Sequence, residues 1–483
     1  MEEMNKHKEQ KKALVLKTLA TMCQSDNAEP YPAMKEIGVA LTDKGDELKA
    51  KILTGGLTNF TYMIYTDSQD AKLFAKLSFA YSHIMPGQNC PLVRAESEFQ
   101  MLKLFQELAP GRVAVPYCCL DIQDDDGVTL KLLVTEWVTS NEQFGNQFID
   151  GAVDPRTAVC VAQSLAALHC SKDKVAIDFN EEIRPFVSSI DPIIQAILQG
   201  YLMADPAPDR ICQVAQEISK TTLDEAFASY QSRVLQREHS IHGDFHVFNI
   251  MVGAKPSPET LERFPPSGDV VICDWELSHV GPAGRDMGPF QAFPFACIFA
   301  HEMNGNTQGV HDIFTFLDTF WKEYDAQLVA HGKSGETDVC HAYRDSLAFC
   351  GLYMIAYAAL GVHMNFLPVD GVSNPDALAK VKQAIGVLGL KLFVLGSGTE
   401  PCSSALLSEL RSKVRKVVDE ELSLLGAGPG NRQKKRRSSS LRSSGVMVGD
   451  GHMHVTGMNR DSFVAMVNLV DNSLEEFADE EEE

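Results

Sequence analysis

The stretch IHGDFHVFNIMV, residues 241–252, decides how the rest of this chain is interpreted. It places a histidine, a glycine and an aspartate after an apolar step, with an asparagine five residues after the aspartate. Taken alone, such a segment is most simply a polar turn between two strands. The chemical alternative is a carboxylate, Asp244, that orients a hydroxyl group, followed by a neutral oxygen ligand, Asn249, for a cation. The surrounding sequence favours this alternative.

A second acidic segment lies downstream. DVVICDWE, residues 269–276, has the pattern of a short apolar strand that ends in Asp274 and Glu276. Residues i and i+2 of an extended segment share a face, so both carboxylates are expected to point at the same cations. Phosphoryl transfer needs a carboxylate that receives the proton of the attacking hydroxyl, and oxygen ligands that hold Mg²⁺ on the nucleotide phosphates. The two segments predict Asp244 as the catalytic base. The predicted metal ligands are Asn249, Asp274 and Glu276.

A glycine turn offers a place for phosphates. LTGGLTNFTY, residues 53–62, puts Gly55 and Gly56 where a strand turns back, which lets backbone N–H groups approach a phosphate closely. We include Asn59, in the same stretch, among the candidate nucleotide-binding residues. The segment is not a Walker A loop, because no GK[ST] follows, and a glycine pair is also common in ordinary hairpins.

Lys76 lies in LFAKLSFA, an otherwise apolar predicted strand, where an ammonium is costly unless it is paired. The segment from Pro91 to Pro110 is predicted to be a helix. At 100° per residue, Glu98 lies on the apolar stripe of that helix, whereas Glu96 points to the opposite side. Glu98 is therefore the predicted buried partner of Lys76. The alternative is a lysine that extends to solvent from an edge strand.

Composition limits the classes of protein that fit. The 483 residues exceed a single hydrophobic core and suggest two lobes. The chain has 65 acidic against 43 basic residues and a net charge of −22, which disfavours nucleic acid and anionic membranes as partners. The 12 cysteines form no CxxC pair, which argues against structural zinc. The start lacks the apolar core of a signal peptide, so we expect a cytoplasmic protein.

Strand-like patterns precede helical ones along the chain. From Leu53 two hairpins are predicted, the second returning along VTLKLLVTEWV, and helical spacing dominates from Asp154 to about Leu425, interrupted by the strands NIMV and DVVICDW. The predicted division is an N-terminal helical extension (1–30), a nucleotide-binding lobe (31–139), a catalytic and substrate lobe (140–426) and a disordered tail (427–483).

These motifs resemble those of the kinase-like superfamily of small-molecule kinases, which includes aminoglycoside phosphotransferases, choline and ethanolamine kinases and methylthioribose kinases. The resemblance spans most of residues 50–425 and is closest to the methylthioribose kinases. It rests on KLSFAY (76–81), RAESE (94–98), IHGDFHVFNIMV and GPAGRDMGPF (281–290). It implies an α+β, two-lobed protein-kinase-like fold, with an N-terminal antiparallel sheet lobe and a larger, mainly helical C-terminal lobe. It also implies Mg²⁺-dependent transfer of the ATP γ-phosphoryl group to a hydroxyl of a small molecule in methionine salvage.

The resemblance also implies roles for single residues. Asp244 is the catalytic base, Asp274 and Glu276 bind metal, and Asp286 braces the catalytic loop. Lys76 and Glu98 form the pair that positions the phosphates, while Glu136 and Trp137 begin the segment beside the adenine. From the residues themselves, His242 is expected to hold the loop through hydrogen bonds.

The chain departs from the methylthioribose kinases at three places. Asn249 stands where they usually carry serine, and Trp275 where they carry proline. In GLYMIAYAALGVH (351–363), Ala356 and Tyr357 replace two adjacent arginines near the sugar substrate. ATP chemistry is therefore better supported than methylthioribose as the acceptor. A choline or ethanolamine kinase, an aminoglycoside phosphotransferase and a pseudokinase scaffold remain alternatives.

The tail carries KKRRSSSLRSS (434–444) before an acidic end. This composition is typical of disorder. Phosphorylation by a basophilic kinase, a nuclear localisation patch and a tail without either role remain alternatives, and the formation of a homodimer also stays open.

Overall fold

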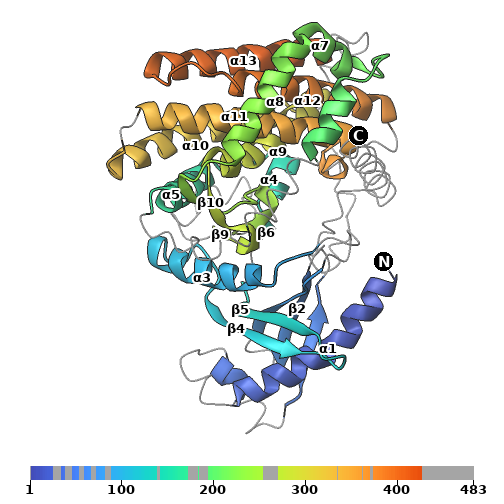
Figure 1. Ribbon diagram of the computed structural model, residues 1–483, viewed down its shortest axis with the longest axis vertical. Helices are drawn as coiled ribbons and strands as arrows, with labels where there is room; N and C mark the ends of the chain where they lie inside the picture. Colours follow the sequence, from blue (N-terminus) through green and yellow to red (C-terminus); the bar gives the residue numbers. More distant parts are fainter. Residues whose placement is uncertain are drawn as a thin grey trace, which may run out of the picture.

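The computed structural model describes a sheet lobe and a helical lobe joined end to end (Figure 1). The described residues are 2–24, 34–38, 46–53, 59–66, 72–81, 89–138, 142–171, 183, 194–253, 270–333, 336–361, 363–369 and 374–426. This arrangement confirms the expected α+β, two-lobed fold. The predicted tail, 427–483, and the predicted lobe boundaries near residues 30 and 139 lie outside the described residues.

The N-terminal lobe is built on a five-stranded antiparallel sheet of order β1-β2-β3-β5-β4. Both predicted hairpins are present, but the sheet starts earlier than the sequence pattern indicated. The missed strand, β1, lies at the sheet edge and buries only Ala50, so its sequence LKAKI carries little alternation. The strands are β1 (Leu48–Ile52), β2 (Asn59–Thr66), β3 (Lys72–Ser78), β4 (Pro116–Gln123) and β5 (Thr129–Glu136).

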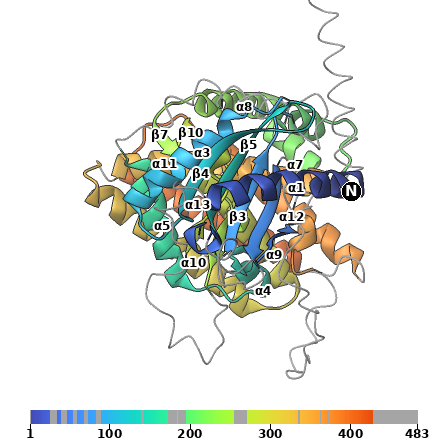
Figure 2. The same cartoon turned by 90° about the horizontal axis from the view of Figure 1, so that it is seen from below.

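The two faces of this sheet are covered by different helices. Because side chains alternate along a strand, Leu132 and Val134 of β5 join the core beneath helix α1 (Glu2–Cys23), while Leu133 joins the core beneath α3 (Val93–Leu108). Figure 2 shows α1 lying across the outer face of the sheet, and Figure 1 places α3 between the sheet and the helical lobe. The predicted N-terminal extension (1–30) thus contains a helix that packs on the sheet of this lobe.

The C-terminal lobe is mainly helical. Its strands are short and come in two groups, β6-β8-β9 and β7-β10, which hold the segments of the site. Its helices are α4 (Gly145–Asp150), α5 (Pro155–His169), α7 (Arg210–Ile218), α8 (Lys220–Val234), α9 (Gly284–Met303), α10 (Thr307–Ala330), α11 (Glu336–Leu360), α12 (Pro375–Gly396) and α13 (Ser404–Gly426); its strands are β6 (Glu142–Gln143), β7 (His239–Ile241), β8 (Ile250–Val252), β9 (Val271–Ile272) and β10 (His279–Gly281).

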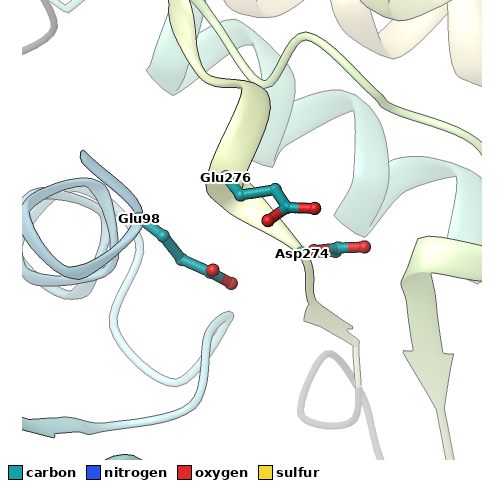
Figure 3. A group of neighbouring side chains, drawn as sticks. All are labelled: Glu98, Asp274 and Glu276. Atoms are coloured by element: carbon teal, nitrogen blue, oxygen red, sulfur yellow. The ribbon is translucent and has the colours of Figure 1, made fainter. Parts of the chain in front are cut away.

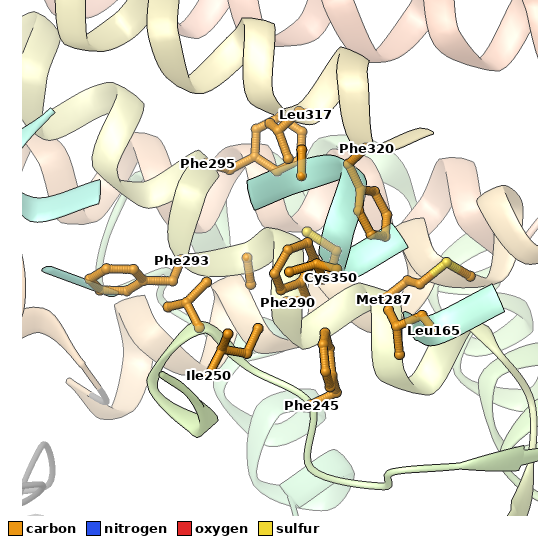
Figure 4. Close-up of a cluster of buried hydrophobic side chains, with 14 of the residues drawn as sticks. Leu165, Phe245, Ile250, Met287, Phe290, Phe293, Phe295, Leu317, Phe320 and Cys350 are labelled. Atoms are coloured by element: carbon orange, nitrogen blue, oxygen red, sulfur yellow. The ribbon is translucent and has the colours of Figure 1, made fainter. Parts of the chain in front are cut away.

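Helix α9 is the centre of this lobe. Every residue from Gly284 to His301 is buried, as expected for a helix that carries apolar residues on all its faces. Figure 4 shows Phe290 and Phe293 of this helix packed among side chains from the neighbouring elements, including Phe245 of the predicted catalytic loop. The core thus extends directly to the back of that loop. No helix within the described residues is long and apolar enough to cross a membrane.

Candidate active site

The predicted catalytic loop connects β7 to β8 and is fixed from behind by Asp286, in the first turn of α9. The Asp286 carboxylate is fully buried and accepts hydrogen bonds from the backbone N–H groups of His242 and Gly243, both at 2.8 Å. His169 Nε2 lies 3.1 Å from the same carboxylate. Burial raises the pKa of Asp286, but the hydrogen bonds from His169 and the backbone outweigh burial and hold the pKa below its ordinary value. The expectation that Asp286 braces the loop is confirmed.

His242 holds the loop from within. Its Nε2 lies 2.9 Å from the backbone oxygen of Cys273, so this nitrogen carries the proton, and its Nδ1 accepts from the backbone N–H of Asp244 at 3.3 Å. Burial lowers the pKa of His242, which keeps the ring neutral. Gly243 has φ +85°, and a Cβ there would lie 2.1 Å from the backbone oxygen of Leu277, so only glycine fits. The predicted loop-holding role of His242 is confirmed.

Asp244 and Asn249 face each other across the loop. The Asn249 amide nitrogen donates to the backbone oxygen of Asp244 at 2.9 Å and lies 3.4 Å from Asp244 Oδ2. Because the nitrogen is engaged in this way, the amide oxygen is the atom that Asn249 can offer to a cation. The Asp244 side chain is 34% exposed, so it can be reached by a substrate.

Lys76 joins three carboxylates. Its Nζ donates to Glu98 Oε2 at 2.8 Å and to Asp274 Oδ1 at 2.5 Å, and it lies 3.5 Å from Glu276 Oε2. One oxygen from each of the three carboxylates lies within 4.8 Å of the others (Figure 3). The predicted Lys76–Glu98 pair is therefore confirmed. The edge-strand alternative is wrong, because Lys76 is 5% exposed on β3, which lies between β2 and β5.

The electrostatics of this cluster are strongly coupled. Burial lowers the pKa of Lys76, but Asp274, Glu276 and Glu98 together raise it above its ordinary value, so the ammonium stays charged. Burial raises the pKa of Glu98 to about 7, although the Lys76 ammonium lowers it. The cluster is therefore held together by a cation that cannot be removed without leaving buried negative charge.

Asp274 and Glu276 converge as predicted, but not for the predicted reason. The segment is not extended: Asp274 has φ +65°, and residues Trp275–Leu277 form the 3-10 turn η3. This tight turn directs both side chains toward Lys76. The fully buried Trp275 anchors the turn, since its Nε1 donates to the backbone oxygen of Ile272 at 3.0 Å. Left-handed backbone is uncommon for a residue other than glycine, although aspartate tolerates it better than most, and here it marks a constrained turn.

Arg94 is a buried site residue that the sequence reasoning missed. It lies on α3, one helical turn before Glu98, and its guanidinium donates to Glu276 Oε2 at 2.7 Å and to Asn59 Oδ1 at 2.8 Å. The signal was present, because positions i and i+4 of a helix share a face, and a buried Glu98 implies that Arg94 points the same way. Asn59 in turn donates from Nδ2 to Glu276 Oε2 at 2.7 Å.

The remaining nucleotide-site candidates lie near the junction of the lobes or outside the described residues. Glu136 ends β5, and its backbone N–H donates to Val115 O at 2.8 Å. Trp137 follows it, and the chain next enters the C-terminal lobe at β6. Their predicted place beside an adenine stays a prediction. Gly55 and Gly56 lie outside the described residues.

An aromatic group lies beside the catalytic loop. The His363 ring stacks on Phe248 with centroids 5.3 Å apart, meets Tyr357 edge-on at 5.3 Å, and lies 5.9 Å from the His246 ring. His246 Nε2 lies 3.7 Å from Asp244 Oδ2, which ties the group to the loop. Burial lowers the pKa of His363 to about 3, so its ring is neutral at physiological pH. Sequence reasoning identified Tyr357 here, but gave no signal for His363.

Comparisons with known proteins identify a family for this chain. A model described as the phosphotransferase enzyme family matches residues 49–297, just over half of the chain. No curated protein sequence matches the chain. Among solved structures the chain is similar to a Ralstonia eutropha protein described as an aminoglycoside phosphotransferase (16% identity, TM-score 0.37, 74% of this chain and 98% of that one). It is also similar to a glucosamine kinase (12% identity, TM-score 0.39, 70% of this chain and 80% of that one). A third similar structure is the GDP complex of aminoglycoside 2′-phosphotransferase-IIIa (13% identity, TM-score 0.34, 76% of this chain and 98% of that one).

Proposed function

Because the chain belongs to the phosphotransferase enzyme family, we propose that it is a small-molecule kinase that transfers the γ-phosphoryl group of ATP to a hydroxyl group. The observation that carries this proposal is the convergence of Lys76, Glu98 and Asp274 in one cluster, next to the braced loop of Asp244, whose His242 bonds to the backbone of Cys273. Phosphoryl transfer relies on positioning and charge stabilisation, and these residues supply both.

In the proposed reaction Asp244 orients the acceptor hydroxyl. The hydroxyl oxygen attacks the γ-phosphorus, the bond from that phosphorus to the bridging oxygen breaks, and ADP leaves, while the hydroxyl proton passes to the Asp244 carboxylate. The loop is ready for this role, because Asp286 and His242 fix its backbone before any substrate binds. Lys76 would present its ammonium to the nucleotide phosphates, with Glu98 holding it in place.

The donor set fits Mg²⁺. This ion prefers oxygen ligands, and Asp274, Glu276 and the amide oxygen of Asn249 provide carboxylate and amide oxygens. When bound, Mg²⁺ would neutralise negative charge on the phosphates during transfer. Glu276 would take part through Oε1, because its Oε2 already accepts from Arg94 and Asn59.

The acceptor is the open part of the proposal. Methylthioribose is one candidate, suggested by the sequence resemblance of the lysine strand and catalytic loop. Ala356 and Tyr357 supply no positive charge, and Tyr357 is buried against His363. The aromatic group of Phe248, Tyr357 and His363 lies beside the Asp244 loop, and aromatic rings would also suit cationic amino-alcohol acceptors such as choline, ethanolamine or an aminoglycoside.

The decisive experiment compares the wild-type protein with Asp244→Asn. Each is assayed for Mg²⁺-dependent ADP production with methylthioribose, choline, ethanolamine and aminoglycosides, and for binding of a fluorescent ADP analogue. We expect the variant to bind the analogue like the wild type and to lose turnover by at least about 100-fold, the low end of what a positioned general base contributes. Unchanged turnover in Asp244→Asn would show that Asp244 is not the catalytic base. A wild type that binds nucleotide but never turns over would favour the scaffold alternative.

A further inference from the structure

Arg94 is a buried cation without a direct part in the proposed chemistry. Its side chain is 1% exposed. Besides its bonds to Glu276 and Asn59, its Nη2 lies 3.3 Å from the backbone oxygen of Phe79. A guanidinium this deep in a protein requires a matching negative charge, and Glu276 supplies one at 2.7 Å.

Arg94, Asn59 and Glu276 form a closed triangle. Arg94 donates one N–H to Glu276 and another to Asn59, and Asn59 donates to the same oxygen of Glu276. The three residues come from α3, β2 and the turn η3. Two of these elements belong to the N-terminal lobe and the third to the C-terminal lobe, so the triangle ties the lobes together at the site.

We propose that Arg94 is a positioning residue that locks α3 and the start of β2 onto the turn carrying Asp274. The inference rests on the proposed kinase function. Lys76 must reach Glu98, on α3, and Asp274, on the turn, at the same time. The separation of α3 from the turn therefore decides whether Lys76 is held in place. The planar guanidinium fixes that separation, because its fork binds two acceptors in one geometry, which an ammonium cannot reproduce.

The triangle also gives Asn59 a specific part. Its amide donates to Glu276 and accepts from Arg94, so the side chain anchors the start of β2, while its predicted contact with a nucleotide stays a prediction. Gly55 and Gly56 come four and three residues before this anchor in the sequence. Arg94 thus acts on both the lysine–glutamate pair and the start of β2.

The test compares three variants of the full chain. Arg94→Met removes both the positive charge and the planar guanidinium that binds two acceptors. Arg94→Lys keeps the charge but not the planar guanidinium. Glu96→Gln, on the same helix, breaks only the partly exposed pair with Lys131 and serves as the matched control. Thermal denaturation first establishes that each is folded. The binding of a fluorescent ADP analogue with and without Mg²⁺, and the kcat and KM of Mg²⁺-dependent ATP hydrolysis, are then measured.

We expect Arg94→Met to lower kcat and the Mg²⁺-dependent affinity for the analogue by at least about tenfold, the effect of losing hydrogen bonds to a charged group. Arg94→Lys should recover part of the loss, and Glu96→Gln should match the wild type. A merely structural arginine would lower the melting temperature but leave kcat and affinity in the folded variants unchanged, and that result overturns the proposal.

Two further outcomes are also decisive. If Arg94→Met does not fold, Asn59→Ala opens the triangle while keeping the Arg94–Glu276 pair, and an unchanged kcat in that variant overturns the proposal. If the wild type binds no nucleotide, the kinase function fails. The positioning role of Arg94 is then tested by backbone amide hydrogen exchange in α3 and in residues 274–278. Faster exchange in Arg94→Lys than in Glu96→Gln supports that role, and equal exchange overturns it.

Discussion

Replacing Lys76 by methionine should destabilise the protein in a pH-dependent way. Methionine keeps the length of the side chain but removes an ammonium that contacts Glu98 and Asp274 and lies 3.5 Å from Glu276. At an effective dielectric constant near 20, each such contact is worth about 5 kcal/mol before desolvation is subtracted. Removing one partner of a buried ion pair costs about 3–5 kcal/mol net. For a large domain this corresponds to a fall in melting temperature of roughly 6–20 °C.

The pH dependence follows from Glu98, whose pKa is already raised to about 7 by burial. Without the ammonium this pKa rises further. A carboxyl with a folded pKa above its unfolded value contributes stability that is fully present below the unfolded pKa and is lost as pH rises through the folded pKa. The deficit of Lys76→Met relative to the wild type should therefore shrink by roughly 1 kcal/mol from pH 8 to pH 6.

Urea denaturation at both pH values measures this effect. Lys131→Met is the matched control, because Lys131 also joins this sheet to α3 but pairs with the more exposed Glu96 and Asp121, so it should cost no more than about 1 kcal/mol. The double variant Lys76→Met/Glu98→Gln should regain stability at pH 8, since it removes the orphaned carboxylate. Equal losses in the two lysine variants, or a deficit of Lys76→Met that does not change with pH, would refute the reasoning.

Three other perturbations test separate features. Asp286→Asn keeps one acceptor where a carboxylate received two backbone N–H groups, so we expect a loss of about 2–4 kcal/mol in urea denaturation and a slower enzyme; wild-type stability would contradict the bracing role. Gly351→Ala would place a Cβ 2.3 Å from Phe393 N and should cost about 1–3 kcal/mol, whereas Gly200→Ala, where a Cβ meets nothing within 4 Å, should be neutral or stabilising. Burial lowers the pKa of His363 to about 3. The neutral His363 ring therefore contributes fully to the free energy of unfolding above the unfolded pKa of 6.5, and this contribution is lost as the pH falls toward 3. Between pH 8 and pH 5 the wild type should lose about 2 kcal/mol more than His363→Asn does, and equal acid sensitivity in thermal denaturation would show that His363 is not the cause.

The sequence predicted the candidate catalytic residues well where they lie close together in the chain or on one face of a single element. The loop with Asp244 and Asn249 is recognisable because both residues lie in one short segment. Helical geometry alone identified Glu98 rather than Glu96 as the buried carboxylate, and the structure agrees, with Glu98 5% exposed. The sequence also identified Lys76 as the partner of Glu98, because a charged side chain in an apolar strand needs an opposite charge nearby.

Prediction failed where local pattern and tertiary packing diverge. The edge strand β1 escaped because a strand with one buried residue has no strong alternation. Asp274 and Glu276 were assigned to an extended segment, since a left-handed residue followed by a 3-10 turn leaves no periodic signal. The prediction that these two carboxylates meet was therefore confirmed, but the extended backbone from which it was made was wrong.

By itself, the sequence determined which groups are available for phosphoryl transfer and which face of each element is buried, because both depend on residue type and on the periods of helix and strand. Only the tertiary structure decided how the groups are joined. The triangle of Asn59, Arg94 and Glu276 and the stacking of His363 on Phe248 link positions far apart in the chain. Such partners depend on how the lobes pack, and no local period records that choice.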